Sequence, residues 1–205
     1  MSTARGRRPV TSRMSGDARR VQIREVAAGL FGRAGYRDTS MDRIADEVGI
    51  KKASLYYYFP SKDRLLIEMH DEMIELIISS HEARMAAGNA SPSELIVGMM
   101  TDIVSLQETH PGSLRVFFEH FNEIPEPERT RVLERRGVYE GYLREQLQRG
   151  IDAGEFKPLD VRLAVFAILG MANWSYQWFR PGGRATAEQV AREFWTMLSA
   201  GIAAT

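Results

Sequence analysis

The stretch that decides the fold is residues 39–60, TSMDRIADEVGIKKASLYYYFP. It opens on two hydroxyl residues that suit a helix N-cap, and Gly49 stands where a residue with positive φ can end a helix. The apolar residues on either side of Gly49 recur at helical spacing. The stretch therefore predicts two short helices joined by a tight turn, the second from about Lys51 to Phe59, which together form a helix-turn-helix.

Helical patterns continue on both sides of this pair. Upstream, apolar residues from Ile23 to Phe31 fall on one stripe, which predicts a helix from about Arg19 to Gly35. Downstream, caps and Pro-Gly breaks delimit a helix that begins at Ser61 and others at about 91–109, 113–121, 125–153, 161–179 and 186–201. No segment alternates apolar and polar residues as a strand does. We therefore predict an all-α protein of about nine helices.

Charge is distributed unevenly along the chain. The 27 Lys+Arg balance the 27 Asp+Glu overall, but residues 1–60 hold twelve basic and six acidic residues, a net charge of +6. The remaining residues carry a net charge of −6. Residues 1–17 contain four arginines and show no periodicity, which predicts a flexible basic arm. A basic head on an acidic body indicates that the head binds a polyanion.

Composition excludes several classes of protein. The chain is 44% hydrophobic and 26% charged, which is typical of globular proteins and not of disordered ones. No apolar run approaches the roughly 18 residues of a membrane span, and the N-terminus lacks a signal-peptide core, so we expect a cytoplasmic protein with no membrane partner. The chain has no Cys, four scattered His and no phosphate-binding glycine loop. We therefore expect no enzymatic activity, no metal and no bound cofactor beyond a possible small-molecule effector.

The second short helix carries the side chains best suited to reading DNA. Leu55 and Phe59 mark its inward side, so its polar residues project outward, and a helix of about 10–12 Å diameter fits the major groove. The expected base and backbone contacts are Lys51, Lys52, Ser54, Tyr56 and Tyr57. Helix ends near Thr39, Ser40 and Lys62 offer phosphate contacts. The alternatives are that the tyrosines fill a core, that Thr39 and Ser40 only cap, and that the lysines form a solvated face.

Residues 19–66 resemble the DNA-binding signature of the TetR family. The resemblance rests on FGRAGYRDTSMDRIA (31–45) followed by VGIKKASLYYYFPSKDRL (48–65). It implies a homodimer that binds a palindromic operator and represses transcription until a small molecule enters the C-terminal domain. By this resemblance Lys52, Ser54, Tyr56 and Tyr57 lie on the recognition helix, Thr39, Ser40 and Lys62 match phosphate contacts, and Lys51 departs from the small residue often found at its position. The resemblance divides the chain into the arm, a helix-turn-helix domain at 18–62 and a ligand-binding and dimerisation domain at 63–205.

The last two expected helices are the natural dimerising pair. Their apolar surface is extensive, and small residues such as Gly170 and Gly201 let helices approach closely. The alternative is that this surface is buried within the core of one protomer. A two-fold operator needs two heads at a fixed spacing, which favours the dimer.

The segment 173–183 is the expected ligand site, with Asn173, Trp174, Gln177, Trp178 and Arg180 as its candidate contacts. The segment resembles the corresponding part of TetR-type repressors of fatty-acid and steroid-ring breakdown, which implies an acyl-CoA thioester as effector. The expected apolar wall comprises Met99, Met100, Ile103, Leu114, Phe117, Phe118, Phe121, Tyr139 and Tyr142, and the expected phosphate partners are Arg129, Arg131, Arg135, Arg136 and Arg180. The alternative is that the aromatics pack a dimer interface and Arg180 caps its helix.

The sequence thus predicts a ligand-responsive transcriptional repressor whose partners are a double-stranded DNA operator, a second copy of the chain and a small molecule. The alternative function is a helical scaffold whose basic head binds anionic partners without sequence specificity. Salt dependence and competitor DNA distinguish the two functions.

Overall fold

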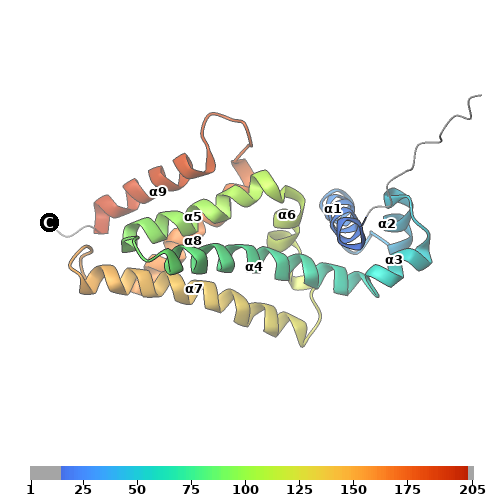
Figure 1. Cartoon of the computed structure of the whole chain (residues 1–205), viewed down its shortest axis with the longest axis horizontal. Coiled ribbons are helices and arrows are strands. Elements are labelled where there is room, and N and C mark those ends of the chain that lie inside the picture. Colours follow the sequence, from blue (N-terminus) through green and yellow to red (C-terminus); the bar gives the residue numbers. More distant parts are fainter. Residues whose placement is uncertain (1–14, 203–205) are drawn as a thin grey trace, which may run out of the picture.

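The computed structural model describes residues 15–202, and over these residues the secondary structure consists of helices joined by loops, with no strand (Figure 1). The all-α prediction is confirmed. The helices are α1 (Gly16–Ala34), α2 (Met41–Val48), α3 (Lys52–Tyr58), α4 (Lys62–Ala87), α5 (Pro92–Thr109), α6 (Pro111–Glu119), α7 (Glu128–Asp152), α8 (Val161–Trp178) and α9 (Ala187–Ile202), with a short 3-10 helix, η1 (Phe121–Glu123), between α6 and α7.

Helix α1 begins three residues earlier than the sequence suggested. Ser15 is its N-cap, and the Ser15 hydroxyl accepts a hydrogen bond from the backbone N–H of Ala18 at 3.2 Å. Gly16 and Asp17, assigned to the basic arm, therefore form the first turn of α1. Residues 1–14 of that arm lie outside the described residues.

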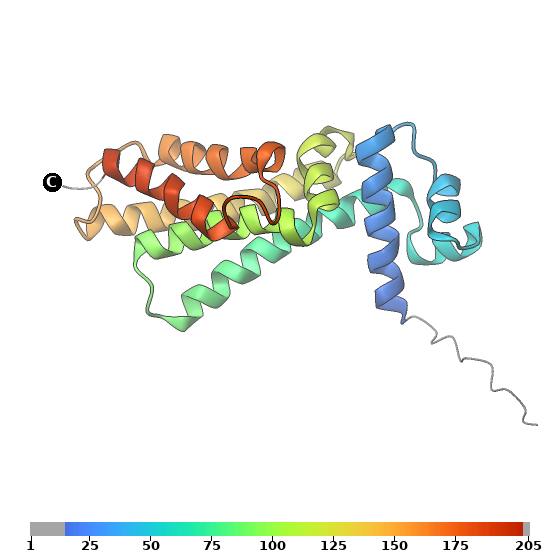
Figure 2. The same cartoon turned by 90° about the horizontal axis from the view of Figure 1, so that it is seen from above.

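The molecule is elongated, with a head at one end and a helical body behind it (Figure 1). Helices α1 to α3 form the head, and α4 runs from the head along the body beside α5 and α7. Seen from above, α1 crosses the end of α4 at a steep angle, and α6 lies between α1 and the rest of the body (Figure 2). Salt bridges from α1 to α4, such as Arg24 to Glu72 at 2.8 Å, fix the head on the long helix.

Two large apolar cores, with a smaller cluster of Val104, Phe179, Ala187 and Val190, stabilise this arrangement. The first joins the head to the near half of the body, because Phe31 of α1, Leu66 of α4 and Leu114 of α6 belong to one buried cluster. The second fills the far half with residues of α5, α7, α8 and α9. The head is thus continuous with α4 and α6 and does not hang on a free linker.

Near the end of α7, the backbone at Gly150 lies very close to the ring of Phe156. Gly150 is buried, and a Cβ added there would overlap the ring of Phe156, which packs on Trp195. We expect Gly150→Ala to lower the free energy of unfolding by about 1–3 kcal/mol through overpacking. Gly141→Ala, on the same helix with open space around its Cβ, should instead stabilise by about 0.5–1 kcal/mol. Urea unfolding measures the free energy of unfolding of both variants. Equal free energies for Gly150→Ala and Gly141→Ala would contradict the close packing of Phe156 on Gly150.

Candidate nucleic-acid interface and effector cavity

Helix α3 presents its polar residues outward, as the sequence indicated. Leu55 and Phe59 are fully buried and anchor the helix to the head. On the other side Tyr57 is 83% exposed and Tyr56 is 41% exposed. Lys51, Lys52 and Ser54 are also exposed. A helix of seven residues cannot be stable alone, so this anchoring is what allows α3 to present an exposed polar surface.

Lys52 is held by an acidic neighbour in the free protein. Its ammonium group lies 2.7 Å from a carboxylate oxygen of Asp42 on α2 and 5.9 Å from the ring centroid of Tyr56. The hydrogen bond from Lys52 to Asp42 raises the pKa of Lys52. Both side chains of the pair are more than half exposed, so water and salt screen the pair and Lys52 can exchange it for DNA at little cost.

Tyr58 has a different role from its two neighbours. It is half-buried and packs against the core of the head, and its carbonyl oxygen accepts a hydrogen bond from Arg20 at 2.7 Å. The guanidinium of Arg20 also stacks 4.5 Å from the ring centroid of Phe59. The core-filling alternative for the tyrosines therefore holds for Tyr58 and not for Tyr57.

The expected phosphate contacts are only partly available. Ser40 is exposed and caps α2 through the N–H of Arg43. Thr39 is fully buried, and its hydroxyl donates a hydrogen bond to the carbonyl of Gly35 at 2.8 Å. The hydroxyl of Thr39 thus holds the turn between α1 and α2 and does not face solvent, so the phosphate contact expected at this helix end stays a prediction that rests on its free backbone N–H groups.

Lys62 is likewise committed within the head. Its ammonium group donates to the carbonyl oxygens of Tyr36 at 2.8 Å and Thr39 at 3.0 Å, and it lies 4.3 Å from the ring centroid of Tyr36. Lys62 therefore ties the start of α4 to the turn that precedes α2. Its charge lies beside the N-terminus of α2, where it still favours an anion.

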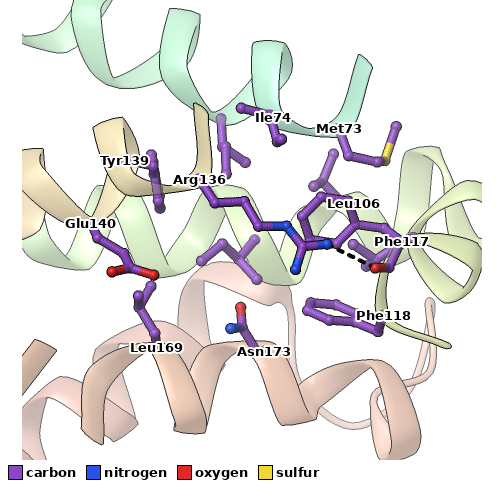
Figure 3. A pocket seen from close by; sticks show the side chains of 13 residues that line it. Met73, Ile74, Leu106, Phe117, Phe118, Arg136, Tyr139, Glu140, Leu169 and Asn173 are labelled. Carbon is purple, nitrogen blue, oxygen red and sulfur yellow. Dashed lines mark hydrogen bonds between the residues drawn. The ribbon is translucent and has the colours of Figure 1, made fainter. Parts of the chain in front are cut away.

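A cavity of about 200 Å³ lies in the body between α4, α5, α6, α7 and α8 (Figure 3). Its walls are mainly apolar, and its lining residues are Met73, Ile74, Ile77, Ile103, Leu106, Leu114, Phe117, Phe118, Arg136, Tyr139, Glu140, Leu169 and Asn173. Of the ligand contacts expected from the sequence, it brings together Ile103, Leu114, Phe117, Phe118, Arg136, Tyr139 and Asn173.

Sequence reasoning missed the contribution of α4. Met73, Ile74 and Ile77 line the cavity, but their helical spacing is that of ordinary core residues, so no sequence signal distinguishes them. Glu140 also lines the cavity, one turn after Arg136 on α7. The position of this acidic residue on the buried side of a helix was the one signal in the sequence that could have identified Glu140 as a cavity residue.

Other expected contacts lie outside this cavity. Met100 is buried in the far core, and the hydroxyl of Tyr142 donates to Glu82 at 2.7 Å. Phe121 lies behind Arg136, with its ring centroid 4.3 Å from the guanidinium. Arg180 is exposed and donates to the carbonyl oxygens of Gln177 and Phe179. These contacts are those expected if Arg180 caps the end of its helix.

The two tryptophans of α8 also face away from the cavity. Trp174 is 61% exposed and Trp178 is 44% exposed, and Gln177 between them is exposed as well. Within one protomer these three side chains therefore form part of the outer surface of α8 and not the wall of a pocket. This position favours the alternative that the aromatics belong to an interface.

Two buried groups beside the cavity have perturbed pKa values. Burial lowers the pKa of Arg136 to about 10. Burial also lowers the pKa of His70 to about 4, with a smaller contribution from the charge of Arg136. The Nδ1–H of His70 donates to the carbonyl of Leu66 at 2.9 Å, and Nε2 has no protein partner. His70 is thus neutral at pH 7, and Arg136 carries the positive charge.

A second groove between α4, α5 and α9 is larger, at about 510 Å³. Four of its five charged residues are already paired, Arg84 with Asp102 and Arg192 with Glu188 at 2.7 Å, and the fifth, Glu94, accepts a hydrogen bond from the backbone of Ser91. It is therefore less suited to an effector than the apolar cavity. Over residues 15–202 no group of three acidic or His side chains is arranged to hold a metal ion, and no helix is long and apolar enough to cross a bilayer.

Comparison with known families accounts for both halves of the molecule. A profile described as bacterial regulatory proteins of the tetR family matches residues 23–69, and one described as a tetracyclin repressor-like C-terminal domain matches residues 89–202. The chain belongs to the TetR family. It is a DNA-binding transcriptional regulator, and α2 and α3 are its helix-turn-helix.

Individual relatives support the assignment of this chain to the TetR family. The transcriptional repressor KstR2 of Mycobacterium tuberculosis is 29% identical over 189 residues, covering 91% of this chain and 94% of its own length. The structure of that ketosteroid regulator matches with a TM-score of 0.83 at 27% identity, over 93% of this chain and 98% of the other. The structure of AibR in complex with isovaleryl coenzyme A and operator DNA matches with a TM-score of 0.76 at 28% identity, over 87% of this chain and 97% of the other.

TetR regulators bind operator DNA as homodimers, and this protomer has an apolar surface suited to dimerisation. Helices α8 and α9 lie side by side at the end away from the head (Figure 2). Their exposed apolar residues include Leu163 at 63%, Phe166, Trp174, Trp178 and Met197. The exposed Gly170 lies in the middle of the α8 stripe, where it allows a second helix to approach.

In this TetR regulator α6 connects the cavity to the head. Phe117 and Phe118 of α6 line the cavity, while the opposite side of α6 packs against α1. At that contact a Cβ added to Gly112 would lie 3.2 Å from the Cβ of Ala28. A movement of α6 therefore cannot leave α1 in place, because close-packed interiors transmit displacement.

Proposed function

We propose that this TetR regulator is a homodimeric repressor that binds a palindromic operator and is released when a coenzyme A thioester places its acyl group in the cavity. The observation that carries the proposal is the position of α6, which forms a cavity wall on one side and contacts α1 on the other. The likeness to AibR, whose structure contains isovaleryl coenzyme A, supports the choice of effector.

The size of the cavity decides which part of such an effector it can hold. A volume of about 200 Å³ is below the ~300–1,000 Å³ of sites that bury a whole drug-sized ligand. The cavity therefore accepts a short acyl group, and the coenzyme A moiety must lie outside it. Arg180 is exposed just after the end of α8, whose inner side carries Asn173 of the cavity, and offers a phosphate contact for that moiety.

The release mechanism is a shift in conformational population. An acyl group that fills the cavity presses on Phe117 and Phe118 and favours a displaced α6. Because α6 contacts α1 and Glu123 of η1 pairs with Arg37 of the head at 3.1 Å, the two heads of the dimer then change their spacing. The effector releases DNA only to the extent that it binds this displaced state more tightly than the operator-bound state.

Two measurements on the full-length protein test the proposal. Selection from a random DNA pool should yield a palindrome, and binding to it should survive competitor DNA and weaken as salt rises. Adding CoA thioesters of two to six carbons to that complex should release the operator. Sequence-independent binding to DNA would favour the scaffold alternative, and an operator complex that no thioester releases would refute the effector.

A further inference from the structure

The cavity contains a half-buried cation, Arg136, whose partners are incomplete. The guanidinium of Arg136 lies 4.0 Å from the ring centroid of Phe117 and 4.3 Å from that of Phe121. One terminal nitrogen donates to the carbonyl of Phe117 at 3.0 Å, and the buried Nε has no partner. Figure 3 shows the side chain crossing the cavity, with the amide of Asn173 facing it from α8.

Neighbouring arginines on α7 are in a different situation. Arg131 pairs with Asp71 at 2.8 Å and Arg135 pairs with Asp71 at 3.1 Å, while Arg129 pairs with Glu126. Across residues 15–202, by contrast, no carboxylate oxygen lies within 4.0 Å of a nitrogen of Arg136. Glu140 attracts Arg136 only at longer range and reaches the cavity near Leu169 (Figure 3).

A buried charge without a counter-ion is costly, and aromatic faces offset only part of that cost. Burial lowers the pKa of Arg136, which shows that its charged form is penalised here. The neutral His70 beside it adds no negative charge. An anion placed in the cavity would therefore gain a charge-assisted interaction that bulk water cannot weaken.

We propose that Arg136 is a specificity-determining residue of the effector cavity and pairs with a carboxylate borne on a short apolar skeleton. Arginine has only donors, so the ligand must supply the acceptor oxygens, and Phe117, Phe118 and Leu114 contact the carbon chain. The carboxylate has two possible sources, the distal end of a dicarboxylic acyl thioester or the head of a free carboxylic acid. The first source rests on the function proposed above, and the second does not.

Two pairs of five-carbon probes separate these sources. Glutaryl-CoA is compared with valeryl-CoA, which ends in a methyl group, and pentanoate is compared with the neutral pentanamide. Each probe is titrated calorimetrically into the full-length protein and its Arg136→Met variant, and is tested for operator release. Arg135→Met is the matched control, because Arg135 is adjacent on α7, pairs with Asp71 and does not line the cavity.

We expect the carboxylate member of at least one pair to bind about tenfold more tightly or better, and Arg136→Met but not Arg135→Met to abolish that preference. A preference below tenfold in both pairs, or one that survives in Arg136→Met, would overturn the inference. The comparison within the unmodified protein decides the question even if Arg136→Met does not fold.

The outcomes also separate this inference from the proposed function. Equal release of the operator by glutaryl-CoA and valeryl-CoA, together with no preference for pentanoate over pentanamide, would overturn the inference and leave the thioester effector intact. Arg136-dependent release by pentanoate alone would support the inference and refute the thioester. If none of the four probes binds, the inference falls, and the thioester effector falls with it only if no thioester of two to six carbons releases the operator.

Discussion

Gly170→Glu on α8 is expected to yield a folded monomer that has lost at least a hundredfold in operator affinity. Within the protomer a Cβ at Gly170 meets no atom within 4 Å, so the substitution does not disturb the fold. In a dimer built on the α8–α9 face, the same side chain would place a charge between Leu163, Phe166, Trp174 and their counterparts. Two linked heads bind with an avidity of ~10²–10⁴ over one head, and that gain disappears in a monomer.

Sedimentation and DNA-binding measurements on the variant test this expectation together. Gly137→Glu is the matched control, because Gly137 is exposed on α7 with open space around its Cβ and lies away from the α8–α9 face. The control should remain dimeric and bind the operator normally. A Gly170→Glu protein that stays dimeric would show that the dimer forms through another surface.

The double substitution Lys52→Ala/Tyr57→Ala is expected to remove the preference of the protein among DNA sequences. Both side chains are exposed on α3, so their loss leaves the head folded. Each good contact to a base edge contributes ~1–3 kcal/mol of discrimination, so losing two should weaken specific binding by about a hundredfold or more. Sequence-independent binding through the remaining basic residues should persist and still weaken with salt.

Competition between operator and random DNA measures this loss of preference. Lys157→Ala, which removes an exposed charge from the body, should leave the preference unchanged. If the double variant still selects its operator, then α3 does not read the bases in the way its exposed surface indicates.

The head could be predicted almost completely from the sequence. Its caps, its glycine turn and the inward positions of Leu55 and Phe59 are local signals, and the structure confirms the buried and exposed sides of α3. The phosphate contacts expected of Thr39 and Lys62 remain predictions, and what the sequence did not indicate is the internal hydrogen bonds of these side chains. Thr39 bonds locally to the carbonyl of Gly35, whereas the carbonyl groups of Tyr36 and Thr39 become neighbours of Lys62 only after the start of α4 has packed against the turn before α2.

The cavity could be predicted only in part. Aromatic and amide residues of α6 and α8 were expected at a ligand site, and Phe117, Phe118 and Asn173 line the cavity. Trp174 and Trp178 were expected there too, yet they point outward, because spacing within a helix does not say which side of it the other helices cover.

The sequence by itself determined the fold class, the order of the helices and the exposed side of α3, because capping, periodicity and charge act over a few residues. Tertiary structure alone decided which arginine of α7 lines the cavity without a carboxylate partner and which side chains surround it. Arg131, Arg135 and Arg136 lie on one helix in similar local sequence, and only the packing of α4 and α6 against α7 gives the first two Asp71 and leaves Arg136 facing a cavity.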